Sequence, residues 1–160
     1  MDYYKLIKLL GKGSFGKVHL GKEILTDNYV AIKCIDRIYM KNDYSKMKIL
    51  QEVLILKTLI HVNIIRLLEV FENSKKYFIV MEYASDGDLL TYMKEHGTLD
   101  EERGKMIFRQ VVEGVGHCHA NKILHRDIKL DNILLDKNLG VKICDFGVSR
   151  FIKKGEIIRE

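Results

Sequence analysis

Hydrophobic residues alternate with polar ones along the first part of the chain, which is the pattern of half-buried β-strands. Residues 4–10 are rich in aliphatic side chains and lead directly into glycines, so we predict a strand that ends in a loop. Val18 and Leu20 alternate with polar residues and predict a second strand. A Thr-Asp-Asn turn at residues 26–28 and an apolar run at residues 29–35 predict a third.

The periodicity becomes helical at residues 44–59, where Met47, Leu50, Leu54 and Leu56 stand among polar residues. Two further strands are predicted after this helix. They cover residues 64–68 and 77–81, and a polar Asn-Ser-Lys-Lys turn lies between them.

A Ser-Asp-Gly break at residues 85–87 separates the predicted sheet from a mainly helical remainder. A short helix is expected at residues 88–94, ending near Gly97. Thr98 and Glu101 have the spacing of a capping box, which predicts the start of a long helix. Six of its residues recur at helical spacing: Met106, Ile107, Gln110, Val111, Gly114 and Cys118. Residues 133–135 and 141–143 then predict a β-hairpin.

Composition narrows the class of protein. The chain has 160 residues, 47% hydrophobic and 31% charged, which is typical of one globular domain. Its net charge of +5 is spread along the chain without a basic cluster interleaved with aromatics, so nucleic acid is not an expected partner. Three cysteines without a Cys-x-x-Cys pair predict reduced thiols inside a cell. With no apolar signal region and no long apolar run, neither secretion nor a membrane partner is expected.

Four short motifs follow one another and suggest phosphate chemistry. They are Gly11-Lys12-Gly13-Ser14-Phe15-Gly16-Lys17-Val18, Val30-Ala31-Ile32-Lys33, His125-Arg126-Asp127-Ile128-Lys129-Leu130-Asp131-Asn132 and Asp145-Phe146-Gly147. In dinucleotide-binding folds a Gly-x-Gly-x-x-Gly loop opens a helix, whereas here a strand is predicted to follow. A hairpin that covers phosphates is therefore favoured. On the third strand, period two places Ala31 and Lys33 on one face, where Ala31 leaves room for a flat base and Lys33 reaches phosphates.

Together these motifs resemble the eukaryotic protein kinase domain. The resemblance implies an α+β, two-lobed fold over residues 1–160. Residues 1–84 would form an N-lobe with a five-stranded antiparallel sheet plus a helix. Residues 85–160 would leave the hinge and form an incomplete helical C-lobe with the catalytic loop. The implied function is that of an ATP-dependent protein serine/threonine kinase, with Mg²⁺ as cofactor and protein hydroxyl groups as acceptors.

The resemblance also assigns residues to the nucleotide. The glycine loop would cover the phosphates, Lys33 would contact them, and Glu52 would hold Lys33. Met81 would lie behind adenine, with backbone groups of Glu82 and Ala84 beside the base and Asp88 at the ribose. The full implied nucleotide set is Leu10, Gly11, Lys12, Gly13, Ser14, Phe15, Gly16, Val18, Ala31, Lys33, Met81, Glu82, Ala84, Asp88 and Leu134.

Four further positions carry the implied transfer chemistry. Asp127 would be the catalytic base that accepts the substrate hydroxyl proton, and Lys129 would neutralise charge on the transferred group. Asp145 would be the main Mg²⁺ ligand, and Asn132 would hold a second metal ion through its carbonyl oxygen. Isolated lysines and helical glutamates are most often exposed surface residues, and the sequence alone leaves that reading open for Glu52.

Lys129 stands two residues after Asp127, which resembles the serine/threonine branch rather than tyrosine kinases. Met-Glu-Tyr-Ala at residues 81–84, with Gly-Asp-Leu after it, is similar to the calcium/calmodulin-dependent and AMP-activated group. The family's Ala-Pro-Glu motif does not follow Asp145-Phe146-Gly147 in this chain. The alternative expectation is therefore a truncated, catalytically inactive fragment that binds nucleotide or a partner, with chaperone association as a further expectation.

Overall fold

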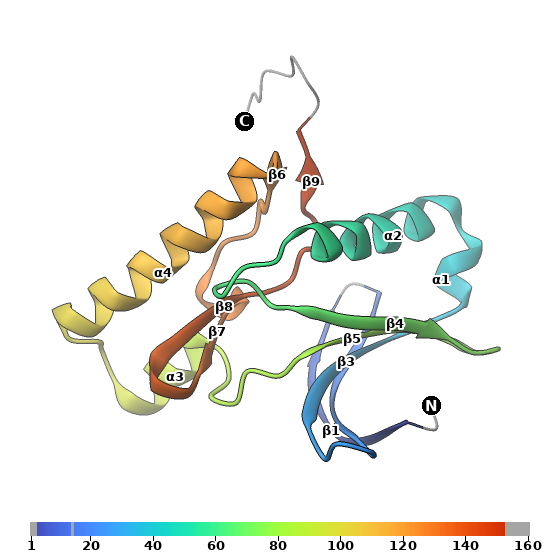
Figure 1. Cartoon of the computed structure of the whole chain (residues 1–160), viewed down its shortest axis with the longest axis horizontal. Coiled ribbons are helices and arrows are strands. Elements are labelled where there is room, and N and C mark those ends of the chain that lie inside the picture. Colours follow the sequence, from blue (N-terminus) through green and yellow to red (C-terminus); the bar gives the residue numbers. More distant parts are fainter. Residues whose placement is uncertain (1–2, 14, 153–160) are drawn as a thin grey trace. The chain divides into compact units, whose positions relative to one another are not determined.

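The computed structural model describes residues 3–13 and 15–152, which form two compact units (Figure 1). Unit 1 takes in the described residues of Met1–Val53 and Arg66–Tyr83, and unit 2 those of Leu54–Ile65 and Ala84–Glu160. Within the described residues, no helix combines the length and apolar character that crossing a membrane requires.

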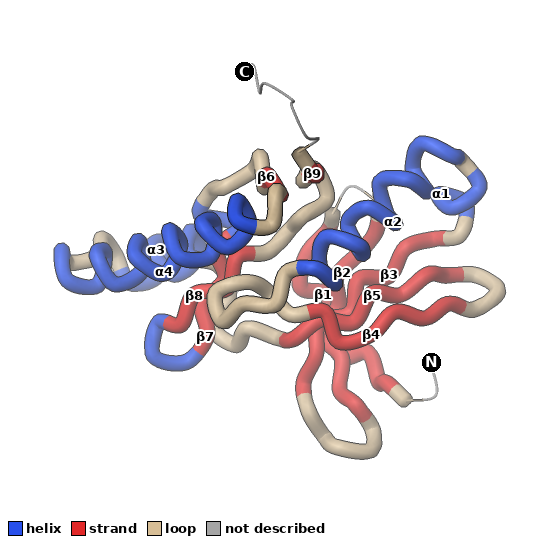
Figure 2. The backbone as a smooth tube through the Cα atoms, turned by 45° about the horizontal axis from the view of Figure 1, so that its top comes forward, coloured by secondary structure: helices blue, strands red, loops and turns tan. Residues whose placement is uncertain are grey.

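Unit 1 is built on one antiparallel sheet with the strand order β1–β2–β3–β5–β4 (Figure 2). Its strands are β1 (Tyr4–Lys12), β2 (Gly16–Glu23), β3 (Tyr29–Asp36), β4 (Leu67–Glu72) and β5 (Lys76–Glu82). The five-stranded sheet and the strand that follows the glycine loop confirm the prediction. A helix would have followed that loop in a dinucleotide-binding fold.

The register of β3 shows which residues share a face of the sheet. Ala31 lies opposite Leu20 on one side and Met81 on the other, and Lys33 lies opposite Val18 and Ile79. Ala31 and Lys33 therefore share one face, as predicted. The residues that alternate with them on β3 join a buried core on the other face, which comprises Tyr4, Val30, Ile32, Cys34, Phe78 and Val80.

Two helices follow β3: α1 (Ile38–Lys41), which the sequence pattern did not predict, and α2 (Asp43–Thr58). Of the four apolar residues that suggested α2, only Leu56 is buried, while Met47, Leu50 and Leu54 are 69%, 42% and 54% exposed. The buried residues of α2 are Ile49, Glu52, Val53, Ile55 and Leu56, and all except Ile55 have the i, i+3, i+4, i+7 spacing of one helix face. Because one residue of that face is a glutamate, the spacing of apolar residues alone does not identify the face.

The predicted strand at residues 64–68 is wrong at its start, because β4 begins at Leu67. Ile64 and Ile65 are buried in unit 2 instead. Their segment pairs with the strand ending at Ile143: the N–H of Ile65 donates to the carbonyl of Ile143 at 2.9 Å, and the N–H of Ile143 donates to the carbonyl of Asn63 at 2.9 Å. The apolar run thus serves two different sets of hydrogen bonds.

Unit 2 combines two helices with two small sheets. Its elements are α3 (Leu89–His96), α4 (Glu101–Ala120), β6 (Ile123–Leu124), β7 (Ile133–Asp136), β8 (Gly140–Ile143) and β9 (Arg150–Phe151), with 3₁₀ turns at Leu130–Asn132 and Lys137–Leu139. The predicted capping box at Thr98 is wrong. The N-cap of α4 is Asp100, whose carboxylate accepts from the N–H of Arg103 at 2.8 Å.

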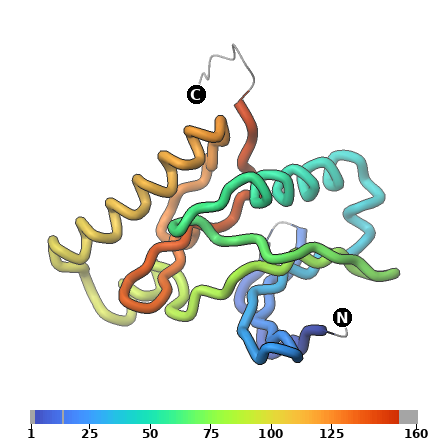
Figure 3. Tube along the Cα trace, in the orientation of Figure 1, coloured from blue at the N-terminus to red at the C-terminus, as the bar shows by residue number. Residues whose placement is uncertain are grey.

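Helix α4 packs closely on β8 and fixes the hairpin that β8 forms with β7, as predicted for residues 133–135 and 141–143. A Cβ on Gly114 would lie 2.7 Å from Cδ1 of Ile143 and 3.1 Å from the carbonyl oxygen of Asn63, so a larger residue would require these groups to shift. The buried Asn63 amide donates to Oε1 of Gln110 and to the carbonyl of Val141, each at 3.1 Å. The chain then runs through residues 125–149 between β6 and β9, which pair antiparallel (Figure 3).

Candidate active site

The glycine loop of unit 1 joins β1 to β2 and is closed by a backbone hydrogen bond from Gly13 to the carbonyl of Gly16, at 2.8 Å. A Cβ on Gly16 would overlap the carbonyl oxygen of Cys34, so this position requires glycine. A Cβ on Gly11 would meet nothing within 4 Å, which leaves space above β1. The ring of Phe15 packs edge-on against Tyr39 of α1, with centroids 6.0 Å apart. Ser14 lies outside the described residues.

Beneath this loop, Lys33 forms an ion pair with Glu52. Nζ of Lys33 lies 2.6 and 2.8 Å from the two carboxylate oxygens of Glu52. The two side chains are only 7% and 4% exposed. A Cβ on Gly13 would be 3.7 Å from Cε of Lys33, which places the loop backbone directly beside the lysine stem. The structure thus brings together three residues that are far apart in the sequence.

Three other predicted nucleotide residues of unit 1 lie on the same sheet face as Lys33. Val18 is opposite Lys33, and Met81 is opposite Ala31, so these four residues share one face. Leu10 and Lys12 are near the end of β1, and both are exposed. The N–H of Glu82 donates to the carbonyl of Arg66 at 3.0 Å, which fixes the end of β5.

The remaining predicted nucleotide residues belong to unit 2. Ala84 is buried, and Asp88 pairs with Leu134 through an isolated antiparallel bridge. The carboxylate of Asp88 is the N-cap of α3: it accepts from the N–H and the hydroxyl of Thr91 at 2.8 and 2.9 Å. The sequence resemblance assigned Asp88 a ribose contact, and this capping role was not predicted, although aspartate at the start of a helix is a common N-cap.

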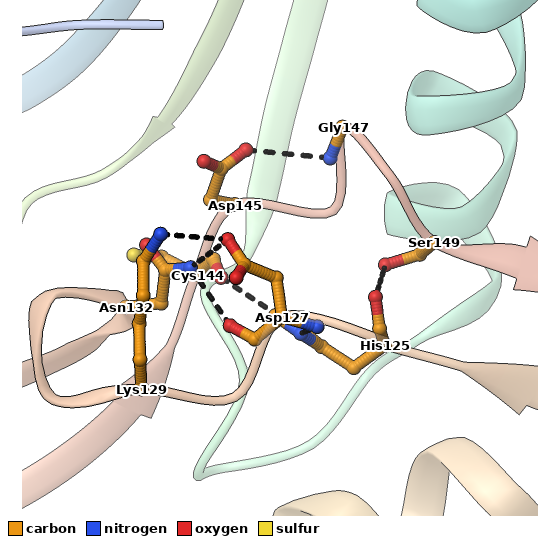
Figure 4. Close-up of polar contacts among 8 residues, drawn as sticks. All are labelled: His125, Asp127, Lys129, Asn132, Cys144, Asp145, Gly147 and Ser149. Atoms are coloured by element: carbon orange, nitrogen blue, oxygen red, sulfur yellow. Dashed lines mark hydrogen bonds and ion pairs between the residues drawn. The ribbon is translucent and has the colours of Figure 1, made fainter. Parts of the chain in front are cut away.

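Asp127, Lys129 and Asn132 of unit 2, which the sequence predicts to carry the transfer chemistry, form one hydrogen-bonded group (Figure 4). Nζ of Lys129 lies 2.9 Å from Oδ2 of Asp127. The amide nitrogen of Asn132 donates to the same Oδ2 and to the carbonyl of Asp127, both at 2.9 Å. Both contacts to the carboxylate use Oδ2. The side-chain nitrogen of Asn132 makes these hydrogen bonds, and its amide oxygen takes no part in them. Lys129 and Asn132 together orient the carboxylate of Asp127.

The same contacts set the charge of Asp127. Hydrogen bonding from Lys129 lowers the pKa of the Asp127 carboxyl, and Asn132 adds to this shift. The carboxylate raises the pKa of Lys129 in return. Asp127 is therefore ionised, and Lys129 is protonated, at neutral pH.

Within unit 2, His125 connects the segment of Asp127 to the segment of Cys144. Its Nδ1 accepts from the N–H of Asp127 at 3.2 Å, and its Nε2 lies 2.9 Å from the carbonyl of Cys144. Because a carbonyl only accepts, these partners assign the proton of the neutral ring to Nε2. Burial lowers the pKa of His125, which keeps it neutral. Its ring packs edge-on against Phe146, with centroids 4.7 Å apart.

Asp145 follows Cys144 in a strained turn. Its φ of 60° lies in the left-handed region, which is uncommon for residues other than glycine. Oδ1 of Asp145 accepts from the N–H of Gly147 at 3.3 Å. The N–H of Cys144 donates to the carbonyl of Asn132 at 3.0 Å, so Asp145 directly follows a residue that is hydrogen-bonded to Asn132 (Figure 4).

Two contacts that the sequence did not predict hold the segment after Gly147 to the catalytic loop. The buried hydroxyl of Ser149 donates to the carbonyl of His125 at 2.9 Å. The guanidinium of Arg126 donates to the carbonyl of Val148, with Nε at 2.7 Å. Both contacts join side chains to backbone carbonyls, for which the sequence carries no pairing signal.

Comparison with known proteins agrees with this geometry. The protein kinase domain family matches residues 4–159 of the chain. Over 156 residues the chain is 45% identical to NUAK family SNF1-like kinase 2 of Homo sapiens and to the protein of the same name from Pongo abelii. Each alignment covers 98% of this chain and 25% of the relative. The chain therefore spans about a quarter of the length of these curated relatives.

Proposed function

The chain belongs to the protein kinase domain family, and we propose that it transfers the γ-phosphoryl group of Mg²⁺-bound ATP to a serine or threonine hydroxyl of a protein. The observation that carries this proposal is the group around Asp127. An ionised carboxylate is fixed through Oδ2 by Lys129 and Asn132, and both its neighbours are oriented by hydrogen bonds. Such a group is suited to accept a proton from a bound hydroxyl.

Nucleotide binding is proposed for the face of unit 1 that carries Lys33. Apolar side chains of Val18, Ala31 and Met81 share that face and suit a flat base. Backbone amides of the glycine loop and the ammonium of Lys33 suit phosphates. Within unit 2, we propose Leu134 and Ala84 for the base and Asp88 for the ribose. The carboxylate of Asp88 already caps α3, so such a contact would be additional to its hydrogen bonds with Thr91.

The metal site is proposed at Asp145 and Asn132. A carboxylate and an amide oxygen are hard oxygen ligands of the kind Mg²⁺ prefers, so the donor set fits the ion. Within the described residues no group of three or more His, Cys, Asp or Glu side chains is arranged to hold a metal. Two protein ligands with phosphate oxygens and water completing the shell is a common arrangement for Mg²⁺ at phosphate sites. Bound there, Mg²⁺ would neutralise charge on the phosphates.

The chain's own residues would then act in defined ways. Asp127 would orient the substrate hydroxyl and accept its proton, and Lys129 would offset the charge of the transferred group. The Lys33–Glu52 ion pair would hold a cation against the phosphates, because burial keeps the ammonium in one position. All three cysteines are thiols in the structure, and we propose that the protein acts in a reducing, intracellular compartment.

Calorimetric titration of the chain with ATP tests the nucleotide part of the proposal. We expect saturable binding that depends on Mg²⁺, and we expect Asp145→Asn to remove the Mg²⁺ dependence. Lys33→Met should weaken phosphate binding. No heat of binding at millimolar ATP would refute a nucleotide site in this chain.

Transfer of radioactive phosphate from ATP to peptides tests the reaction type. We expect incorporation into a serine or threonine peptide and none into the same peptide with tyrosine at that position. If the chain binds Mg²⁺-ATP but labels neither peptide, the proposed transferase activity of this chain is refuted while the nucleotide site stands.

A further inference from the structure

We propose that a second site in unit 1 binds the guanidinium group of an arginine side chain presented by another polypeptide. The site is an open cavity of about 500 Å³ formed at one end of the five-stranded sheet. The register brings its residues together: Tyr4 lies opposite Glu23, and Val30 lies opposite Glu82. We call this the strand-end cavity.

Tyr4, Val30 and the three glutamates of the strand-end cavity lie on the other face of the sheet from Lys33, whereas Tyr29, at the start of β3, alternates with Val30. Tyr4 and Val30 line it, and both belong to the core cluster on that face. Successive residues of a strand point to opposite faces, so Val30 and Ala31 face different sides. The glutamate side chains of the cavity therefore point away from the face that carries Val18, Ala31 and Met81, and the inference does not depend on kinase activity.

The charge of the lining favours a cation. Three of the nine lining residues are glutamates, at positions 23, 69 and 82, and none of the nine is Lys, Arg or His. The chain as a whole has 27 Lys and Arg against 22 Asp and Glu, so the cavity reverses the sign of the chain. Lys22, which precedes Glu23 in the sequence, forms an ion pair with Asp27 at 2.7 Å. Like charges gathered in a concave, partly apolar site strengthen the local field and attract the opposite charge.

Hydrogen bonds fix these carboxylates in place before any ligand binds. The N–H of Arg66 donates to Oε1 of Glu82 at 2.7 Å, and the hydroxyl of Thr26 donates to Glu23. Burial raises the pKa of Tyr4, and hydrogen bonding to Glu69 adds to the shift, so the phenol stays neutral. An ionised carboxylate accepts up to about four hydrogen bonds, so Glu23 and Glu69 retain capacity for a donor.

Aromatic rings make guanidinium a better ligand than ammonium. Tyr29 and Tyr83 are among the lining residues, and their rings have centroids 6.5 Å apart and are tilted by 56°; Tyr29 is 55% exposed. The ring of Tyr4 is stacked on Phe71 at 6.0 Å, which restricts its motion. Guanidinium is planar, stacks on aromatic faces and donates in a fork to carboxylates, whereas ammonium is a point charge. An exposed rim is accessible to a side chain from another polypeptide.

Nuclear magnetic resonance titration of the ¹⁵N-labelled chain tests the proposal, with N-acetylarginine amide as the probe. We expect saturable shifts at the backbone amides of Tyr29, Val30 and Glu69. N-acetylcitrulline amide has nearly the same shape without the charge and should produce no saturable shift there. N-acetyllysine amide should bind at least threefold more weakly, because it lacks the planar fork.

A matched pair of variants tests the carboxylates. Glu23→Gln combined with Glu69→Gln should weaken arginine binding at least tenfold. Glu72→Gln, also on β4 but paired with Arg37 outside the cavity, should change it less than twofold. Equal shifts with citrulline, unchanged affinity in the double variant, or lysine binding as tightly as arginine would each overturn the proposal. If the double variant does not fold, the arginine and citrulline comparison on the unmodified chain decides alone.

Discussion

Replacing Lys33 with methionine while Glu52 remains should destabilise unit 1 by about 3–5 kcal/mol, because it leaves a buried carboxylate without its partner. The ammonium and carboxylate are 2.6 Å apart and almost fully buried. At an effective dielectric constant of about 20 their attraction is about 6 kcal/mol, and desolvation of the two ions costs a similar amount. The intact pair is thus nearly neutral in net stability, whereas breaking it is expensive.

Two variants serve as matched controls for Lys33→Met. Lys33→Met combined with Glu52→Leu removes both charges and should recover most of the lost stability. The Lys105–Glu101 pair has the same 2.6 Å separation, but its side chains are 73% and 81% exposed. Lys105→Met should therefore cost only about 0.3–0.5 kcal/mol, because water screens the exposed pair.

Urea unfolding followed by circular dichroism measures these differences, since the chain has no tryptophan. A cost below about 1 kcal/mol for Lys33→Met would contradict the reasoning, because breaking a buried ion pair is expected to cost several times that. So would a double variant that is no more stable than Lys33→Met alone.

Three further outcomes follow from local geometry. Gly16→Ala should cost about 1–3 kcal/mol of stability in urea unfolding, because its Cβ would overlap the carbonyl of Cys34, whereas Gly11→Ala has open space and should cost less. Asp100→Ala should cost about 0.5–2 kcal/mol by removing the N-cap of α4, and Thr98→Ala should be nearly neutral; equal costs would restore the capping box. Lys129→Met should raise the pKa of Asp127, measured by ¹³C resonance, toward the ordinary value of about 3.9. Because that pKa is lowered in the folded protein, Asp127 contributes stability above about pH 3.9 that is lost as the pH falls through its lowered pKa; an unchanged pKa in the variant would refute the assigned cause.

The strands of unit 1 were predictable because alternation and turn residues there agree with the fold. Period two correctly placed Ala31 and Lys33 on one face. The apolar run at residues 64–68 was misread because its first residues bond to Ile143 in unit 2 rather than to β5. Such a change of partner depends on tertiary packing, which local periodicity does not report.

Helix α2 shows a different limit. Its buried face includes Glu52, and three of its apolar residues point to solvent. The spacing of apolar residues predicted the helix but not which face is buried. Charged residues are usually exposed, whereas Glu52 is buried because it is paired with Lys33. The partner of Lys33 came from family resemblance, and the structure places the two groups in contact.

Within the candidate site, the motif residues could be identified from the sequence, whereas the contacts that hold them in place could not. Asp127, Lys129 and Asn132 were assigned separate roles from one motif, and the structure adds that they form one hydrogen-bonded group. The contacts of Ser149 and Arg126 end on backbone carbonyls, whose positions depend on the folded loop. No residue type at a partner position marks such a contact in advance.

Phosphoryl transfer by Asp127→Asn tests the central claim most directly. In a single-turnover assay with Mg²⁺-ATP and a serine peptide, the unmodified chain should label the peptide. Asp127→Asn should reduce the rate by about 10²–10⁴-fold, because an amide does not accept the hydroxyl proton. ATP affinity measured in parallel should stay within a fewfold, since Asp127 is not among the proposed nucleotide residues. Labelling by Asp127→Asn at the rate of the unmodified chain would contradict the account.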